Sequence, residues 1–195
     1  MIELACDGIV PLWLSEAMGI SNSDKVYRRK LNIAPTGRSR QLIQVQAVSW
    51  SSSELASPIH LVRHVMMTSV ARYVLQAQPS QWDNLVIRTT RKSPRGRKWA
   101  SDHFDVLRGK NFSRPDAELW LGNSPIAVEV DSGKHSLDAM VKRIISWSKL
   151  YSEVYWVLFS SLRQEKIMNK LQSLNQGKYM HYIVLPCWWS PVRPL

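Results

Sequence analysis

The chain has 195 residues, a hydrophobic content of 45%, a formal net charge of +11 and a sequence pI near 10.0. Its apolar content excludes a globally disordered protein, and its length fits one domain or a core with a small appendage. Cys6 and Cys187 lack paired or metal-ligand spacing, and no apolar run reaches the roughly 18 residues of a membrane span. We therefore expect a cytoplasmic protein with no membrane partner, and its basic excess indicates a polyanion such as nucleic acid.

Residues 11–30 have the pattern of two short helices separated by a turn. Gly19 is placed to end the first helix, and the second would end at residues 26–29, which include two arginines. This pattern resembles a helix-turn-helix, whose second helix enters the major groove of DNA. Arg28 and Arg29 are therefore predicted DNA contacts. An ordinary helical hairpin on the surface fits the same residues.

Residues 41–48 alternate as a strand or wing would, and a serine-rich connection follows at 49–58. We place a domain boundary here, between residues 1–57 and 58–195. A helix is predicted after Pro58. His60 and His64 lie at i and i+4 on one face of it, a spacing that can hold zinc. No third ligand follows at a suitable distance, so we interpret this pair as structural.

The run 85–87 is predicted to be the first strand of the core. After it, residues 88–98 contain six basic residues and no acidic one. Such a loop is better explained by phosphate contacts than by solvation alone. The predicted DNA-binding residues of this loop are Arg91, Lys92, Arg95, Arg97 and Lys98. A short helix at 99–108 would bring Asp102 or Asp105 towards the core as a third acidic group.

Two strands at 116–121 and 126–131, joined by a turn at 122–124, form the part of the chain with the clearest chemistry. Because side chains alternate along a strand, Ala127, Glu129 and Asp131 share one face of the second strand. A mostly apolar strand that ends in carboxylates is unusual. Buried carboxylates are usually paired, hydrogen-bonded or bound to metal.

The remaining pattern predicts a helix at 136–151, a strand at 154–160, a helix at 163–174 and a strand at 181–186. Together with the preceding elements, this order gives an α/β fold with a mixed sheet.

The sequence Arg114-Pro115-Asp116, a hairpin turn and an apolar strand ending in Glu129-Val130-Asp131 resembles the PD-(D/E)xK nuclease superfamily. The resemblance extends over about residues 60–186 and implies the superfamily's αβββαβ core, a restriction-endonuclease-like fold. The pattern is most similar to the replication-relaxation family, accessory proteins of plasmids and other mobile elements. That family often carries a winged helix before the nuclease-like core.

The resemblance implies a site in which Asp116 and Glu129 bind Mg²⁺ or Mn²⁺. Asp131 stands where the superfamily has its lysine, and it could be a further metal ligand. Lys134 or Lys142 could supply the missing cation, and Lys142 is also a predicted DNA contact. The implied catalytic set is Asp116, Glu129, Asp131 and Lys134. Alternatively the acidic strand end is a relic, with Glu129 and Asp131 ion-paired or capping the next helix.

Three functions follow from these observations. The first is a DNA-binding accessory protein of a mobile element, acting with other proteins of that element. The second is a Mg²⁺-dependent DNA endonuclease that uses Asp116 and Glu129. The third is a scaffold whose basic charge serves an acidic protein partner.

Overall fold

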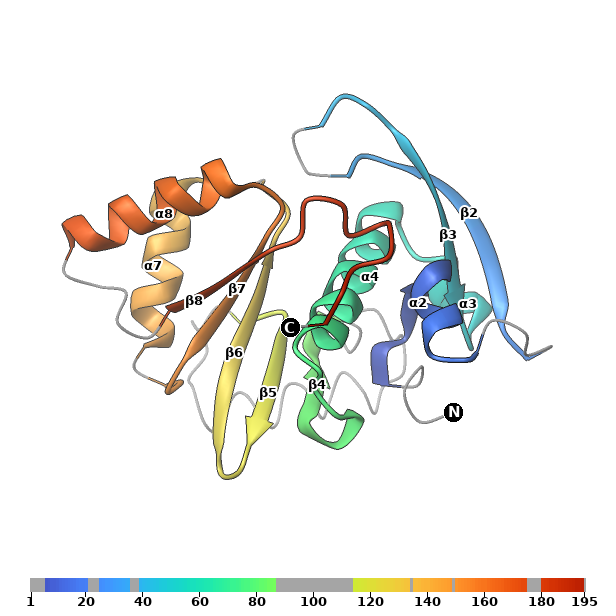
Figure 1. The fold of residues 1–195 in the computed structure, drawn as a ribbon, viewed down its shortest axis with the longest axis horizontal. Helices are drawn as coiled ribbons and strands as arrows, with labels where there is room; N and C mark the ends of the chain where they lie inside the picture. Colours follow the sequence, from blue (N-terminus) through green and yellow to red (C-terminus); the bar gives the residue numbers. More distant parts are fainter. Residues whose placement is uncertain are drawn as a thin grey trace.

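The chain folds as two β-sheets on either side of one long helix, α4 (Ile59–Val74) (Figure 1). The structure is a computed structural model, which describes residues 6–20, 25–35, 39–86, 114–133, 135–148, 150–174 and 180–194. The predicted contacts in the basic loop at 88–98, the candidate ligands Asp102 and Asp105, and Lys134 lie outside these ranges.

The smaller sheet is antiparallel and has the strand order β1-β3-β2. Its strands are β1 (Ile9–Pro11), β2 (Tyr27–Ile33) and β3 (Ile43–Ser49). Two short helices pack beside it, α2 (Leu12–Ala17) and α3 (Ser52–Leu55). The first helix of the predicted pair and the strand predicted at 41–48 are thereby confirmed.

The prediction of a second helix in a helix-turn-helix is wrong, because Arg28 and Arg29 lie on strand β2. In register with β3, Leu31 pairs with Val45 on the buried face of the sheet. Burying alternate residues requires an extended backbone, and an α-helix would separate these side chains onto different faces. A helix entering the major groove therefore does not exist at this position.

The larger sheet is mixed, and this confirms the α/β class. Its strands are β4 (Trp82–Asn84), β5 (Ala117–Leu121), β6 (Ser124–Asp131), β7 (Val154–Leu158) and β8 (Met180–Val184). They lie in the order β4-β5-β6-β7-β8; β5 is antiparallel to both β4 and β6, whereas β6, β7 and β8 run parallel. The nuclease-type core remains a prediction.

The first strand of this sheet begins earlier than predicted. Leu85 and Val86 are helical and follow the short 3₁₀ turn η1 (Pro79–Gln81) and strand β4. Both of their backbone N–H groups donate to the carbonyl of Asp116. The apolar run 85–87 is too short for its periodicity to distinguish a strand from a helix.

The predicted hairpin is confirmed, with Leu121 of β5 opposite Ser124 of β6. Gly122 takes a φ of +73°, which glycine adopts without the steric cost that other residues pay. This tight turn aligns β5 with β6 and so fixes where Asp116 lies relative to Glu129.

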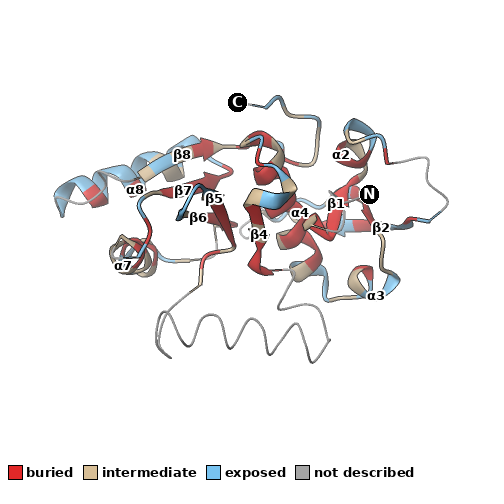
Figure 2. Ribbon diagram, turned by 90° about the horizontal axis from the view of Figure 1, so that it is seen from below, coloured by how far each residue is buried: buried red, intermediate tan, exposed pale blue. Residues whose placement is uncertain are grey.

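Helices α7 (Leu137–Trp147) and α8 (Ser161–Ser173) cover the face of the larger sheet opposite to α4. Ala127 of β6 packs in their cluster, whereas Val128 and Val130 point into the cluster around α4. Figure 2 shows the buried residues concentrated along α4 and the strands, with α8 largely exposed. No helix among the described residues is long and apolar enough to cross a membrane.

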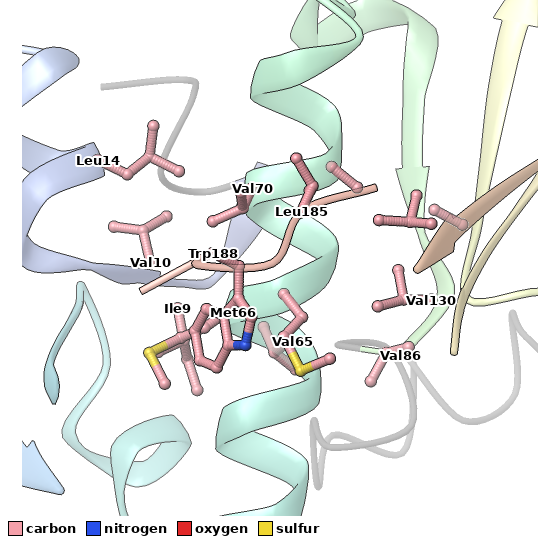
Figure 3. Close-up of a cluster of buried hydrophobic side chains, with 14 of the residues drawn as sticks. Ile9, Val10, Leu14, Val65, Met66, Val70, Val86, Val130, Leu185 and Trp188 are labelled. Carbon is pink, nitrogen blue, oxygen red and sulfur yellow. The ribbon is translucent and has the colours of Figure 1, made fainter. Parts of the chain in front are cut away.

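One hydrophobic cluster connects the two sheets through α4 (Figure 3). Val65, Met66 and Val70 of α4 lie between Val10 on one side and Val130 on the other. The core is therefore continuous across the predicted boundary between residues 57 and 58.

Candidate functional site

A cavity of about 380 Å³ opens where the first turns of α4 face the ends of the β5–β6 hairpin. Its polar lining comes from α4, from the residues just before β5, from the end of β6 and from α7, which are far apart in the sequence. The titratable and cationic side chains in this lining are His60, Arg63, His64, Arg114, Asp116, Glu129, His135 and Arg143.

Two hydrogen bonds hold Asp116 at the open end of the β5–β6 hairpin. The backbone N–H of Val130 donates to its Oδ2 over 2.7 Å, and Oδ1 lies 2.8 Å from Nε2 of His64. The first contact ties Asp116 to strand β6, and the second ties it to α4. Burial lowers the pKa of His64, but the charge and hydrogen bond of Asp116 raise it more, so the pKa lies above its usual value.

Glu129 is almost fully buried beside Asp116. Nη1 of Arg143, on α7, donates to its Oε1 over 2.7 Å, while Oε2 has no hydrogen-bond partner among the described residues. Burial raises the pKa of Glu129 well above its usual value, the charge of Asp116 raises it further, and Arg143 opposes both. The free oxygen and the raised pKa both indicate a carboxyl group that is incompletely neutralised.

Asp131 has a separate environment. Its Oδ2 accepts from Nε of Arg163 over 2.5 Å, and its Oδ1 accepts from the backbone N–H of Gly133. It lines a neighbouring cavity of about 490 Å³ near the starts of α7 and α8. Asp131 and Glu129 are thus each paired with an arginine, as the relic interpretation expects.

Arg63 is buried at 7% exposure and has no carboxylate partner among the described residues. Its Nη1 donates to the backbone carbonyl of Ala34, and its Nε–H has no acceptor in the described part of the chain. Burial lowers the pKa of this guanidinium. A buried cation without an anion is costly, and the described residues supply no carboxylate to this guanidinium.

The donor set suits a hard divalent cation. Asp116 and Glu129 offer carboxylate oxygens, which Mg²⁺ and Mn²⁺ prefer, and Oε2 of Glu129 accepts no hydrogen bond from the described residues. No group of three His, Cys, Asp or Glu placed to hold a metal occurs in the part of the chain that the structure describes. Among the described residues, the carboxylates that line this cavity are Asp116 and Glu129.

The structure brings together two of the four implied catalytic residues, Asp116 and Glu129. Lys142 is exposed on α7, and the neighbouring Arg143 contacts Glu129 instead. Arg28 and Arg29 lie on the smaller sheet, and Nη1 of Arg29 donates to the carbonyl of Leu55.

Sequence reasoning missed Arg63, His135 and Arg143, and it interpreted His64 as structural. The pairing of His64 with Asp116 joins distant parts of the chain, so no local spacing could reveal it. Arg143 directly follows Lys142, which the sequence predicted as a candidate cation. The helix had been predicted, but its rotation relative to the strand could not be derived from the sequence.

Comparison of this chain with family models, with curated proteins and with solved structures found no match.

Proposed function

We propose that this protein binds DNA and that the cavity between α4 and the β5–β6 hairpin receives a backbone phosphate. The observation that carries the proposal is Arg63, a buried guanidinium with a free Nε–H and no carboxylate partner among the described residues. A phosphate oxygen supplies both the missing charge and the missing acceptor. The resemblance to replication-relaxation proteins suggests the setting, an accessory protein of a mobile genetic element.

The electrostatics of the cavity favour an anion. Each of its two carboxylates already contacts a cationic or titratable partner, His64 or Arg143. Arg63 and Arg114 add positive charge, and both lie in the lining. The first turn of α4, whose backbone N–H groups carry partial positive charge, opens at the same place. The net charge of +11 would draw DNA towards the protein from a distance.

The test is to replace Arg63 with methionine, which keeps most of the buried volume and removes the charge. We expect weaker binding to duplex DNA and a slope of log affinity against log salt that is smaller by about 0.9, the value for one phosphate contact. Lys166→Ala, an exposed charge on α8, is the matched control and should change both quantities less.

A structural role for Arg63 gives a different result. If the guanidinium mainly supports the fold, Arg63→Met should lower the free energy of unfolding by more than about 1 kcal/mol and leave the salt slope unchanged. Absence of any binding to duplex or single-stranded DNA at low salt would refute DNA binding itself. An acidic protein partner would then be the better explanation of the charge.

The second candidate is a metal-dependent endonuclease, which the free Oε2 of Glu129 favours. Asp116 and Glu129 would hold the ion, which when bound supplies an activated water and stabilises charge on the phosphate. His64 orients Asp116, and Arg143 can contact phosphate but cannot accept a proton. Burial and the charge of Arg143 lower the pKa of His135, so its neutral imidazole is available as a proton acceptor near pH 7.

A supercoiled-plasmid assay with Mg²⁺ or Mn²⁺ distinguishes the two candidates. Endonuclease activity requires nicking by the wild type that is lost in Asp116→Asn and in Glu129→Gln, with both variants still folded. If the wild type binds DNA but nicks no duplex, single-stranded or branched substrate, the binding function stands and the endonuclease is refuted.

A further inference from the structure

The far part of the hairpin of β2 and β3 presents a polar face that belongs to neither the cavity nor the core. β1 pairs only with residues 47–49 of β3, so residues 30–33 and 43–46 form a two-stranded ribbon beyond it. In Figure 1 this ribbon rises beside α4, and its far end arches over the top of that helix on the side of the larger sheet. Its far end is thus free of a third strand among the described residues.

The register assigns the side chains of the ribbon to two different faces. Leu31 pairs with Val45, and both are buried with Ile33 on the face towards the body. On the opposite face Lys30 pairs with Gln46 and Asn32 pairs with Gln44. Lys30, Asn32 and Gln44 are exposed and Gln46 is half-buried. The apolar face holds the ribbon against the protein, so the amide and lysine side chains point outwards.

These outward side chains are the types that read base edges. Lysine and arginine donate to O6 and N7 of guanine, and asparagine and glutamine pair with N6 and N7 of adenine. Residues 25–50 contain six lysines and arginines and no aspartate or glutamate. The charge therefore fits a polyanion, whereas the row of amides adds the capacity to distinguish bases.

We infer that the β2–β3 ribbon enters the major groove of duplex DNA and reads base edges with Asn32, Gln44 and Gln46, assisted by Lys30. The major groove, about 12 Å wide, admits a two-stranded β-ribbon. This inference rests on the proposed DNA binding and adds sequence preference to it. The phosphate cavity fixes position on the backbone, whereas the ribbon selects the site.

The experiment begins with selection of preferred duplexes from a random pool by the full-length protein. Affinity is then compared between the selected sequence and a scrambled one. The triple variant Asn32→Ala, Gln44→Ala, Gln46→Ala should lose discrimination by about 5- to 150-fold per lost bidentate contact, while its affinity for the scrambled duplex changes little. Gln172→Ala, an exposed amide on α8, is the matched control and should retain the preference.

A second measurement uses the wild type alone, so it does not depend on folding of the variant. Methylation of guanine N7 marks the major groove, and methylation of adenine N3 marks the minor groove. If methylation of guanine N7 within the selected site weakens binding, the result supports the inference. Interference confined to adenine N3 overturns it, because the ribbon would then lie in the wrong groove.

The remaining outcomes separate this inference from the proposed function. A wild type that binds no duplex overturns both. A wild type that binds duplex DNA without preference, or a triple variant that keeps its preference, overturns the ribbon alone. Equal affinity for double-stranded RNA also overturns it, since the deep, narrow major groove of A-form RNA does not admit a ribbon.

Discussion

Three acidic residues on one hairpin have three different environments, and this difference decides their chemistry. Asp116 accepts from a backbone N–H and contacts His64; Glu129 has one arginine contact and one free oxygen; Asp131 is fully paired. The sequence predicts that these carboxylates lie at the end of a strand. It does not predict their partners, which come from α4, α7 and α8 and depend on how the helices rotate against the sheet.

At the residue scale, the raised pKa of Glu129 predicts a pH-dependent stability. The folded state binds this proton more tightly than the unfolded state, whose pKa is near 4.5. The free energy of unfolding should therefore fall as pH rises from 4.5 through the folded pKa. The raised pKa of His64 adds a fall of the same sign above pH 6.5. Glu129→Gln removes the first contribution, so it should lose less stability than the wild type between pH 5 and pH 8.

Urea unfolding at the two pH values measures this difference. Glu165→Gln, an exposed carboxylate on α8, is the control and should follow the wild type. An equal loss in Glu129→Gln and the wild type would mean that Glu129 is fully neutralised by Arg143, and the case for a metal or another cation beside it would disappear.

At the element scale, long periodic segments were predictable and short ones were not. The helix after Pro58, the hairpin and the helix after residue 136 all form where apolar periodicity and turn chemistry agree. The basic residues at 28–30 concealed strand β2, although the alternation of Leu31 with Ile33 was a signal of period 2. Pairing with β3 and burial of these two side chains in the core around α4 are tertiary effects that outweigh the local helix-turn-helix pattern.

Helix α7 gives a prediction at this scale, because it carries Arg143 to Glu129. The hydroxyl of Ser136 accepts from the N–H of Ala139 and so caps the helix, whereas Ser160 begins α8 without a side-chain cap bond. Ser136→Ala should lower the free energy of unfolding by about 1 kcal/mol, and Ser160→Ala should lower it less. Urea unfolding of both variants measures this. Equal losses would show that the Ser136 hydrogen bond contributes nothing.

At the scale of the whole molecule, one core joins two sheets that the sequence assigns to separate regions. The predicted boundary followed composition, since the serine-rich stretch at 49–58 resembles a linker. The structure places α3 within this stretch and packs α4 against both sheets. The composition of a segment indicates how flexible it is in the unfolded chain. It does not indicate which faces of helices and sheets pack together in the folded protein. The cavity and the ribbon therefore belong to one packed body, as the proposal that both contact a single duplex requires.

The central claim is that Arg63 meets a DNA phosphate in the cavity. At 22.5 kDa the protein is small enough for its arginine Nε–Hε groups to be followed by NMR, with the Arg63 signal assigned by its loss in Arg63→Met. Because this N–H has no acceptor in the described protein, duplex DNA should shift its resonance strongly, in step with saturation of binding. An Arg63 resonance that stays unchanged while other signals report a saturated complex would contradict the claim and place the DNA elsewhere on the surface.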